Sequence, residues 1–167
     1  MRKIRTILSV SAVTAFALWA VTVGASADGT RAPGKNIVET AVAAGKFKTL
    51  TSLLTQAGLA KALEGKGPYT VFAPTDAAFA KVPKATLARL GRNKAQLRSV
   101  LLLHVAKGRL TAAKVTQRRW VKTLNGRRLA IRVRGGKVFV GGAQVVTPDV
   151  TASNGVIHAI DQVLLPR

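Results

Sequence analysis

The sequence predicts a single α+β domain behind an N-terminal export signal. Its 167 residues fit one domain with a short targeting segment, since domains usually have about 100 to 200 residues. The apolar fraction of 48% can form a core even though the net charge is +21. Apolar residues recur at helical spacing in the first part of the chain and alternate from Trp120 onward. Helices followed by strands are typical of the α+β class.

The first 27 residues have the three parts of an export signal. A positively charged head at residues 2–5 precedes an apolar run over residues 7–23, and residues 25–27, Ala-Ser-Ala, form a cleavage site. We predict a signal peptide over residues 1–27 and a polar linker over residues 28–35. The alternative is an uncleaved membrane anchor, because the apolar run approaches the ~17 to 25 residues that cross a bilayer.

The predicted domain, residues 36–167, begins with short helices. Asn36 can cap a first helix that runs to about Ala44. A second helix carries apolar residues at helical spacing over residues 47–57 and ends at a glycine, and residues 59–63 add a further helical turn. Each of these helices has one apolar side, so we expect that side to pack on a core.

One strand and three further helices complete the first part of the domain. The aromatic and β-branched run over residues 69–73 predicts a buried strand. Thr75 can cap a short helix after it, and another helix follows near residues 84–90. Asn93 opens a last helix on which His104 shares a side with apolar residues, so we expect His104 to face inward.

From Trp120 onward the pattern predicts antiparallel strands joined by tight turns. Glycine-containing pairs at 125–126, 135–136 and 141–142 can supply the positive φ that hairpin turns need. We expect the last strand to run from Val156 to Leu164.

The strand after Gly126 divides its side chains between two faces, because neighbouring side chains of a strand point to opposite sides. We expect one face to join the core, with Leu129, Ile131 and Val133. The other face carries Arg128, Arg132 and Arg134. The strand is therefore predicted to be apolar inside and cationic outside.

Two sequence blocks resemble those of a known family. Residues 69–79 read Tyr-Thr-Val-Phe-Ala-Pro-Thr-Asp-Ala-Ala-Phe, and residues 154–161 read Asn-Gly-Val-Ile-His-Ala-Ile-Asp, followed by Val-Leu-Leu-Pro at 163–166. These blocks, with Thr-Leu-Asn-Gly at 123–126, resemble the FAS1 domain family, also called fasciclin or βig-h3 domains. The opening segment from Asn36 onward is similar as well, so the resemblance extends to Pro166.

The resemblance implies a FAS1 fold, in which a β-wedge of two sheets has helices packed around it. It also implies a secreted or surface-displayed module of the bacterial single-domain type that mediates adhesion or binds matrix components without catalysis. Two spots of the family are linked to partner binding, and here they correspond to His104, preceded by Leu103 in place of tyrosine, and to Asp149-Val150 in place of Asp-Ile. The lost tyrosine argues against recognition of the integrin kind. The alternative for His104 is a core histidine, and we expect His158 to be a hydrogen-bonded core residue.

The sequence contains no recognisable set of catalytic or metal-binding residues. The six carboxylates are scattered along the chain and there is no cysteine. No nucleophile elbow, phosphate-binding loop or His-Glu-x-x-His helix is present, and the spacing of His104, His158 and Asp161 matches no standard metal motif. We therefore predict no enzymatic activity, no metal and no cofactor.

The charge instead predicts an anionic partner. Removing residues 1–27 takes away three of the 27 basic residues and none of the six acidic ones, so the predicted mature chain carries +18. Outside the membrane such a charge favours anionic polysaccharide or another envelope or matrix polyanion, with surface proteins as a further partner class. The candidate binding residues form one cluster along the chain: Arg118, Arg119, Lys122, Arg127, Arg128, Arg132 and Arg134.

Three alternatives to this binding function stay open at the level of sequence. The charge could serve solubility alone. A wedge between two sheets could carry an apolar ligand such as a carotenoid or a lipid. The protein could also be a structural component of the envelope. Specific binding to nucleic acid is disfavoured, because only Trp120 accompanies the cluster as a stacking residue. We expect no stable membrane insertion once the signal is cleaved, and a secreted, periplasmic or cell-surface location.

Overall fold

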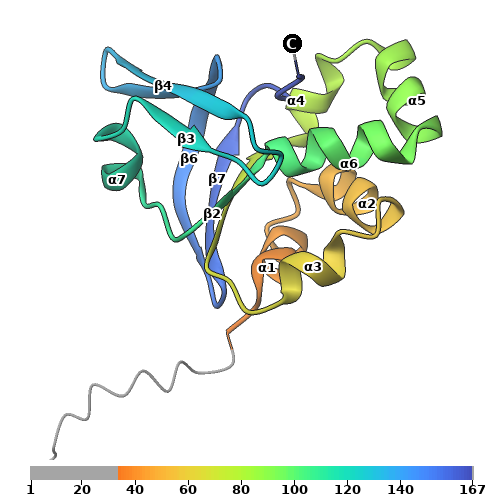
Figure 1. Cartoon of the computed structure of the whole chain (residues 1–167), viewed down its shortest axis with the longest axis horizontal. Coiled ribbons are helices and arrows are strands. Elements are labelled where there is room, and N and C mark those ends of the chain that lie inside the picture. Colours follow the sequence, from red (N-terminus) through yellow and green to blue (C-terminus); the bar gives the residue numbers. More distant parts are fainter. Residues whose placement is uncertain (1–33, 167) are drawn as a thin grey trace, which may run out of the picture. The chain divides into compact units, whose positions relative to one another are not determined.

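The computed structural model describes residues 34–166, and its elements are labelled in Figure 1. The predicted signal peptide, and the predicted linker except for its last two residues, lie outside the described residues. No helix among residues 34–166 combines the length and the apolar character that a membrane span requires.

The helices begin where the capping residues predict. The side chain of Asn36 accepts a hydrogen bond from the backbone N–H of Glu39, whose carboxylate accepts one from the N–H of Asn36. The side chains of Thr75 and Asn93 cap the fourth and sixth helices by accepting from the backbone N–H groups of Ala78 and Gln96, without a return bond. The helices are α1 (Ile37–Ala43), α2 (Lys48–Gln56), α3 (Ala60–Glu64), α4 (Asp76–Ala80), α5 (Lys84–Arg92), α6 (Lys94–Leu103) and α7 (Ala112–Thr116).

The strands form one sheet in the order β2-β1-β7-β6-β5-β4-β3. All neighbours are antiparallel except β1 and β7, which run parallel. The strands are β1 (Tyr69–Pro74), β2 (Val105–Lys107), β3 (Trp120–Lys122), β4 (Arg128–Arg134), β5 (Lys137–Val140), β6 (Ala143–Ala152) and β7 (Gly155–Ile160). The antiparallel run predicted from Trp120 onward is confirmed.

The sheet folds over on itself into a nearly closed wedge. Two irregularities in the register of β6 with β7 lie between Val145 and Val150, where a strand can bend. The two ends of the sheet then meet, because Ala106 of β2 bridges Thr123, which follows β3 directly. The backbone N–H of Leu124 also donates to the carbonyl oxygen of Val105, 2.7 Å away.

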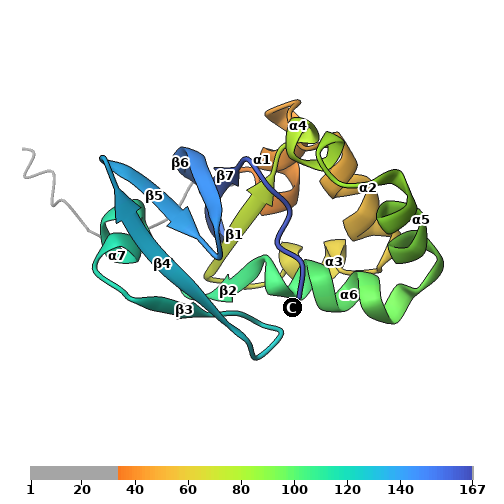
Figure 2. The same cartoon turned by 90° about the horizontal axis from the view of Figure 1, so that it is seen from above.

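The core has two parts, one on each face of β1 and β7. Figure 2 shows α1 to α6 gathered on one side of these strands and β3 to β5 on the other. On the helical side, Val71 and Ile157 pack with the apolar faces of the helices. Inside the wedge, Phe72 and Ile160 pack with side chains from β3 to β6. Since both faces of β1 and β7 are covered, these strands are apolar almost throughout.

The expectation that Val133 joins the core is wrong. Its side chain is 51% exposed, whereas Ile131 is 8% exposed. β3 pairs with β4 only up to Ala130, and β6 pairs with β5 only at Phe139 and Val140. The far end of the β4–β5 hairpin therefore has no neighbouring strand to cover Val133.

The last strand is shorter than predicted, ending at Ile160 instead of Leu164. Its parallel partner β1 ends at Pro74, opposite Ile160, so no strand remains for residues 161–164 to pair with. The chain leaves the sheet after Asp161 exchanges two hydrogen bonds with Gln144. β2 and α7 lie in a stretch, residues 105–119, for which the sequence predicted no element.

Candidate polyanion-binding groove

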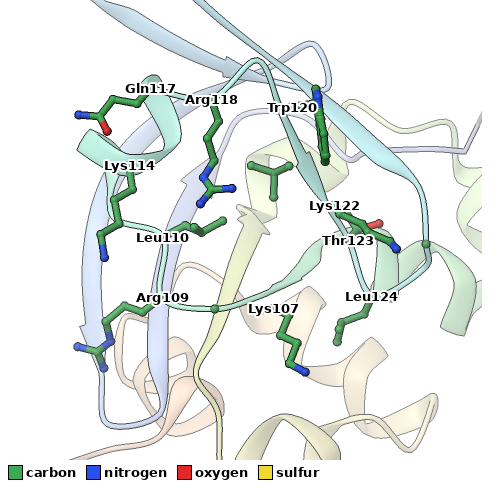
Figure 3. Close-up of a pocket in the computed structure, with 13 residues that line it drawn as sticks. Lys107, Arg109, Leu110, Lys114, Gln117, Arg118, Trp120, Lys122, Thr123 and Leu124 are labelled. Carbon is green, nitrogen blue, oxygen red and sulfur yellow. The ribbon is translucent and has the colours of Figure 1, made fainter.

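A groove with a volume of about 1040 Å³ lies between the end of β2, α7 and β3. Figure 3 shows the side chains that line it. Its lining includes Trp120 and five cationic side chains, which are Lys107, Arg109, Lys114, Arg118 and Lys122. None of the described residues that line it has a carboxylate side chain. We call it the basic groove.

Three elements place these cations around one hollow. Lys107 ends β2, Lys114 lies on α7, and Arg118 follows α7. On β3, Trp120 and Lys122 are exposed and Val121 between them is buried, as alternation along a strand requires. The groove is therefore assembled from separate short elements, and its charge depends on their relative positions.

Hydrogen bonds hold the loop between β2 and α7 in place. The hydroxyl of Thr70 in β1 donates to the carbonyl oxygen of Gly108, 2.7 Å away, and accepts from the N–H of Leu110, 2.8 Å away. The buried ring of His158 donates from Nε2 to the carbonyl oxygen of Leu110 at 2.7 Å. Arg109 donates from Nη2 to the carbonyl oxygen of Ala152 at 2.9 Å. This network fixes the wall on which Arg109 and Leu110 lie.

The residues of the predicted basic cluster do not lie at one site in the structure. Arg118 and Lys122 line the basic groove. Arg127, Arg128 and Arg132 line a second groove of about 460 Å³, on the other side of β4 from β3. Arg134 pairs with Lys137 near the end of the β4–β5 hairpin, and Arg119, which precedes β3, is exposed and accepts a backbone hydrogen bond from Ile131.

Sequence reasoning missed three of the five cations of the basic groove. Lys107, Arg109 and Lys114 precede the predicted cluster and lie in the stretch without a predicted element. They reach the cluster because β2 meets the end of β3 through the bridge from Ala106 to Thr123. Since that contact joins the two ends of the sheet, spacing along the chain gives no signal for it.

The acidic residues leave the basic groove uncompensated. Within residues 34–166, Glu39 is engaged at the start of α1, and Asp161 forms with Lys81, at 3.6 Å, the only ion pair between described residues. Asp149 holds the start of α7, where its Oδ1 accepts from the N–H of Ala112 at 2.8 Å. Neutralisation of the groove is therefore left to counterions or to a ligand.

His104 is buried, as the core interpretation predicts. Its Nδ1 donates to the carbonyl oxygen of Val100 at 2.8 Å, and its Nε2 accepts from the N–H of Leu164 at 2.9 Å. Burial lowers the pKa of His104 to about 4, although the hydrogen bond to Val100 acts in the opposite direction. The neutral ring thus joins the C-terminal segment to α6. Partner binding by His104, Asp149 and Val150, which the family resemblance implies, stays a prediction.

His158 is also a hydrogen-bonded core residue, as expected. Its ring stacks on Phe72, with the ring centres 5.7 Å apart. Nδ1 accepts from the N–H of Asp149 at 3.2 Å, so the ring is neutral with its proton on Nε2. Among residues 34–166 no three His, Asp or Glu side chains come together as a metal site. His104, His158 and Asp161 therefore serve separate structural roles.

The comparisons with known proteins decide the family. The family model described as "Fasciclin domain" matches residues 45–166. The chain belongs to the fasciclin (FAS1) domain family. Protein sll1483 of Synechocystis is 48% identical over 132 residues, which cover 78% of this chain and 73% of that protein. Uncharacterized protein sll1735 of the same organism is 44% identical over 130 residues, covering 78% of this chain and 97% of that protein.

A solved structure confirms the FAS1 fold. The FAS1 domain pair from the insect cell adhesion molecule fasciclin I is similar with a TM-score of 0.59 and 25% identity. The similarity covers 73% of this chain and 46% of that one. The wedge and its helices therefore have the arrangement that the resemblance implied.

The first hallmark block of this FAS1 domain has a structural explanation. Thr75 caps α4, and Asp76 beside it accepts hydrogen bonds from the backbone N–H groups of Thr49, at 2.9 Å, and Lys48, at 3.4 Å. Asp76 thereby caps α2, whose own preceding residue, Phe47, provides no side-chain cap. Burial of Asp76 acts to raise its pKa, but the hydrogen bonds from Thr49 and Lys48 and the Lys48 charge outweigh it, so the pKa is lowered.

The second block joins the N-terminal helices to the sheet. Asn154 accepts from the N–H of Ile37 and donates to the carbonyl oxygens of Leu63 and Gly65. Gly155 after it leaves no room for a side chain, since a Cβ would overlap the carbonyl oxygen of Tyr69. Both residues therefore act through packing and hydrogen bonding.

Proposed function

We propose that this FAS1 domain is exported and attaches, without catalysis, to anionic polysaccharide of the envelope or matrix through the basic groove. The observation that carries the proposal is the set of five cations around one hollow, to which residues 34–166 contribute no carboxylate. Cationic surfaces of this kind attract polyanions, and the attraction weakens as salt screens it.

The chemistry of the groove suits sulfate and carboxylate groups. Arg118 offers a planar guanidinium group, which can bind an oxyanion through two parallel hydrogen bonds, while Arg109, which donates to Ala152, adds positive charge. Lys107, Lys114 and Lys122 have flexible side chains, so their ammonium groups can adjust to the irregularly spaced anionic groups of a polysaccharide. Single-stranded nucleic acid fits less well, because successive bases need several aromatic platforms and Trp120 is the one aromatic residue that lines the groove.

The alternative of an apolar carrier has less support in the structure. Two hollows between described residues have mostly apolar linings: one of about 60 Å³, lined by Leu59, Leu63, Tyr69, Leu102 and Leu124, among others, and one of about 320 Å³, lined by Ala78, Val82, Pro83 and Val163, among others. Pockets for small-molecule ligands usually measure about 300 to 1,000 Å³. The first hollow is therefore too small for a carotenoid or a lipid tail, and the second only reaches the lower end of this range.

Two further observations agree with an exported adhesion module. The similar solved structure comes from a cell adhesion molecule, and the N-terminal residues have the pattern of an export signal.

Both described histidines are buried with each ring nitrogen in a hydrogen bond, so neither is free to act as a base in the groove.

The test is retention on immobilised heparin, used as a sulfated and carboxylated model polysaccharide, at increasing salt. We expect the protein to bind at low salt and the triple variant Lys114→Gln, Arg118→Gln and Lys122→Gln to elute at clearly lower salt. Its affinity should fall on the order of tenfold at low salt, since each exposed charge contact contributes up to about 1 kcal/mol.

A control variant removes the same charge elsewhere. Lys61, Lys84 and Arg98 are exposed on α3, α5 and α6, so their replacement by glutamine lowers the net charge equally and leaves the groove intact. Equal loss of retention in both triple variants would show that only the net charge matters and would overturn the groove as the site. Failure of the unmodified protein to bind at low salt would overturn the proposed function.

A further inference from the structure

The basic groove does not end at β3, because a stacked pair connects it to the second groove. Trp120 lines the basic groove and is 46% exposed. The guanidinium carbon of Arg128 lies 4.2 Å from the centre of the Trp120 ring, and Arg128 lines the second groove. Arginine over an indole face is a favourable cation–π arrangement, so the two side chains form one surface between the grooves.

The strand register makes this surface continuous. Trp120 lies opposite Ala130, and Lys122 lies opposite Arg128. All four side chains are exposed, whereas Val121 and Leu129 between them are buried. Ala130 contributes only a methyl group, so its side chain does not obstruct the surface beside the indole. Arg132 is the next residue on the same face of β4.

The second groove begins where β4 loses its neighbour. β5 pairs with β4 only from Ile131 onward, and Gly141 and Gly142 turn the chain away beside the first residues of β4. The hollow that results has a volume of about 460 Å³, and its lining includes Arg128 and Arg132 of β4 together with Leu165 and Pro166. As in the basic groove, none of the residues from 34 to 166 that line it has a carboxylate side chain.

We propose that the two grooves form one track across β3 and β4, whose ligand is an extended acidic polysaccharide that occupies both. This inference rests on the proposed function and names the form of its ligand. The Arg128–Trp120 stack lies under the middle of the polysaccharide, and Arg132 contacts the part of the polysaccharide that occupies the second groove. Each exposed cation contributes little alone, but one chain that reaches both grooves makes the second contact intramolecular and gains affinity from it.

The experiment is calorimetric titration of the full chain with heparin-derived oligosaccharides, from the disaccharide to the dodecasaccharide, at one low salt concentration. We expect the affinity to rise steeply at the length that reaches both grooves and to level off beyond it. The affinity for short oligosaccharides should depend on Arg118 and Lys122 of the basic groove and should not change when Arg132 is replaced.

A pair of neighbouring arginines supplies the decisive comparison. Arg132→Gln should lower the affinity for the dodecasaccharide about fivefold and the affinity for the shortest oligosaccharide that binds less than twofold. Arg134→Gln is the matched control, because Arg134 lies on the same face of the same strand and lines neither groove. It should change both affinities less than twofold. Trp120→Ala should lower the affinity of long chains more than that of short ones.

The outcomes separate this inference from the proposed function. If affinity does not depend on length, or if Arg132→Gln and Arg134→Gln weaken long chains equally, the track is wrong while polysaccharide binding at the basic groove stands. If no oligosaccharide of any length binds, the proposed function itself is wrong. If single-stranded DNA of equal charge binds more tightly than the dodecasaccharide, the assignment to polysaccharide is overturned.

Discussion

The N–H of Asp149 donates a hydrogen bond to Nδ1 of His158, 3.2 Å away, beneath the wall of the basic groove. The other ring nitrogen donates to the carbonyl oxygen of Leu110, and the carboxylate of Asp149 accepts from the first N–H of α7. One buried, neutral imidazole therefore supports both the loop before α7 and the residue that caps α7. A proton on Nδ1 would face the N–H of Asp149, so the arrangement requires the neutral ring.

Acid should destabilise the protein through its two buried histidines. Burial lowers the pKa of His158, against the raising effects of the hydrogen bond to Leu110 and of the Asp149 charge, and it lowers the pKa of His104 to about 4. A group whose folded pKa lies below its unfolded value of 6.5 contributes full stability above 6.5 and loses it as pH falls toward the folded pKa. For His104 the loss is about 3 kcal/mol by pH ~4.

Urea unfolding at pH ~7 and pH ~4.5 measures this loss, and His104→Gln should reduce the difference between the two free energies of unfolding. Protonation of Asp76 does not affect this comparison. Because its pKa is lowered from the ordinary value of 3.8, its contribution to stability is lost only at pH values below that. A wild-type protein equally stable at both pH values would contradict the neutral, buried state of the rings.

Two glycines should respond in opposite ways to an added methyl group. Gly155→Ala forces a Cβ onto the carbonyl oxygen of Tyr69 and should cost more than about 3 kcal/mol or prevent folding. Gly91→Ala lies within α5 with open space around its Cβ and should stabilise the protein by about 0.5 to 1 kcal/mol. Thermal unfolding of both variants checks the pair, and a tolerated Gly155→Ala would contradict the close approach of β1 and β7.

Asp76 should contribute to stability as the cap of α2. Asp76→Ala removes the acceptor for the N–H groups of Thr49 and Lys48 and should cost about 1 kcal/mol, with Asp76→Asn less harmful. Glu64→Ala, at an exposed carboxylate on α3, is the control and should change the free energy of unfolding by less than about 0.5 kcal/mol. Equal effects of the two alanine variants in urea unfolding would refute the capping role.

The two inward positions of β4 should differ strongly in their cost of truncation. Ile131→Ala should lower the free energy of unfolding by about 2 to 4 kcal/mol, because it leaves a cavity inside the wedge. Val133→Ala should change it by less than about 0.5 kcal/mol, since this side chain is exposed at the hairpin end. A large effect at Val133 would mean that the hairpin end is covered in solution.

Local patterns predicted the elements well because each depends on neighbouring residues. Asn36, Thr75 and Asn93 cap helices from within three residues, and alternation correctly separated Arg128 from Leu129. The same alternation failed at Val133, because a strand's inward face is buried only where another element covers it.

What sequence reasoning missed depends on contacts between distant segments. The basic groove needs β2 to meet the end of β3, and the roles of Asp149 and Asp76 need α7 and α2 to lie beside them. The family resemblance implied the wedge but gave no position for Lys107 or Lys114. The charge predicts an anionic ligand, which stays a prediction, while the fold determines which cations lie together.

The most direct test uses the fluorescence of Trp120. The predicted signal peptide, residues 1–27, contains Trp19, so a variant that begins at Asp28 has Trp120, which lines the basic groove, as its only tryptophan. Titration of this variant with heparin at low salt should change the emission in a saturable way, and added salt should reverse the change. Heparin binding without any change in Trp120 emission, or no binding at all, would contradict the account.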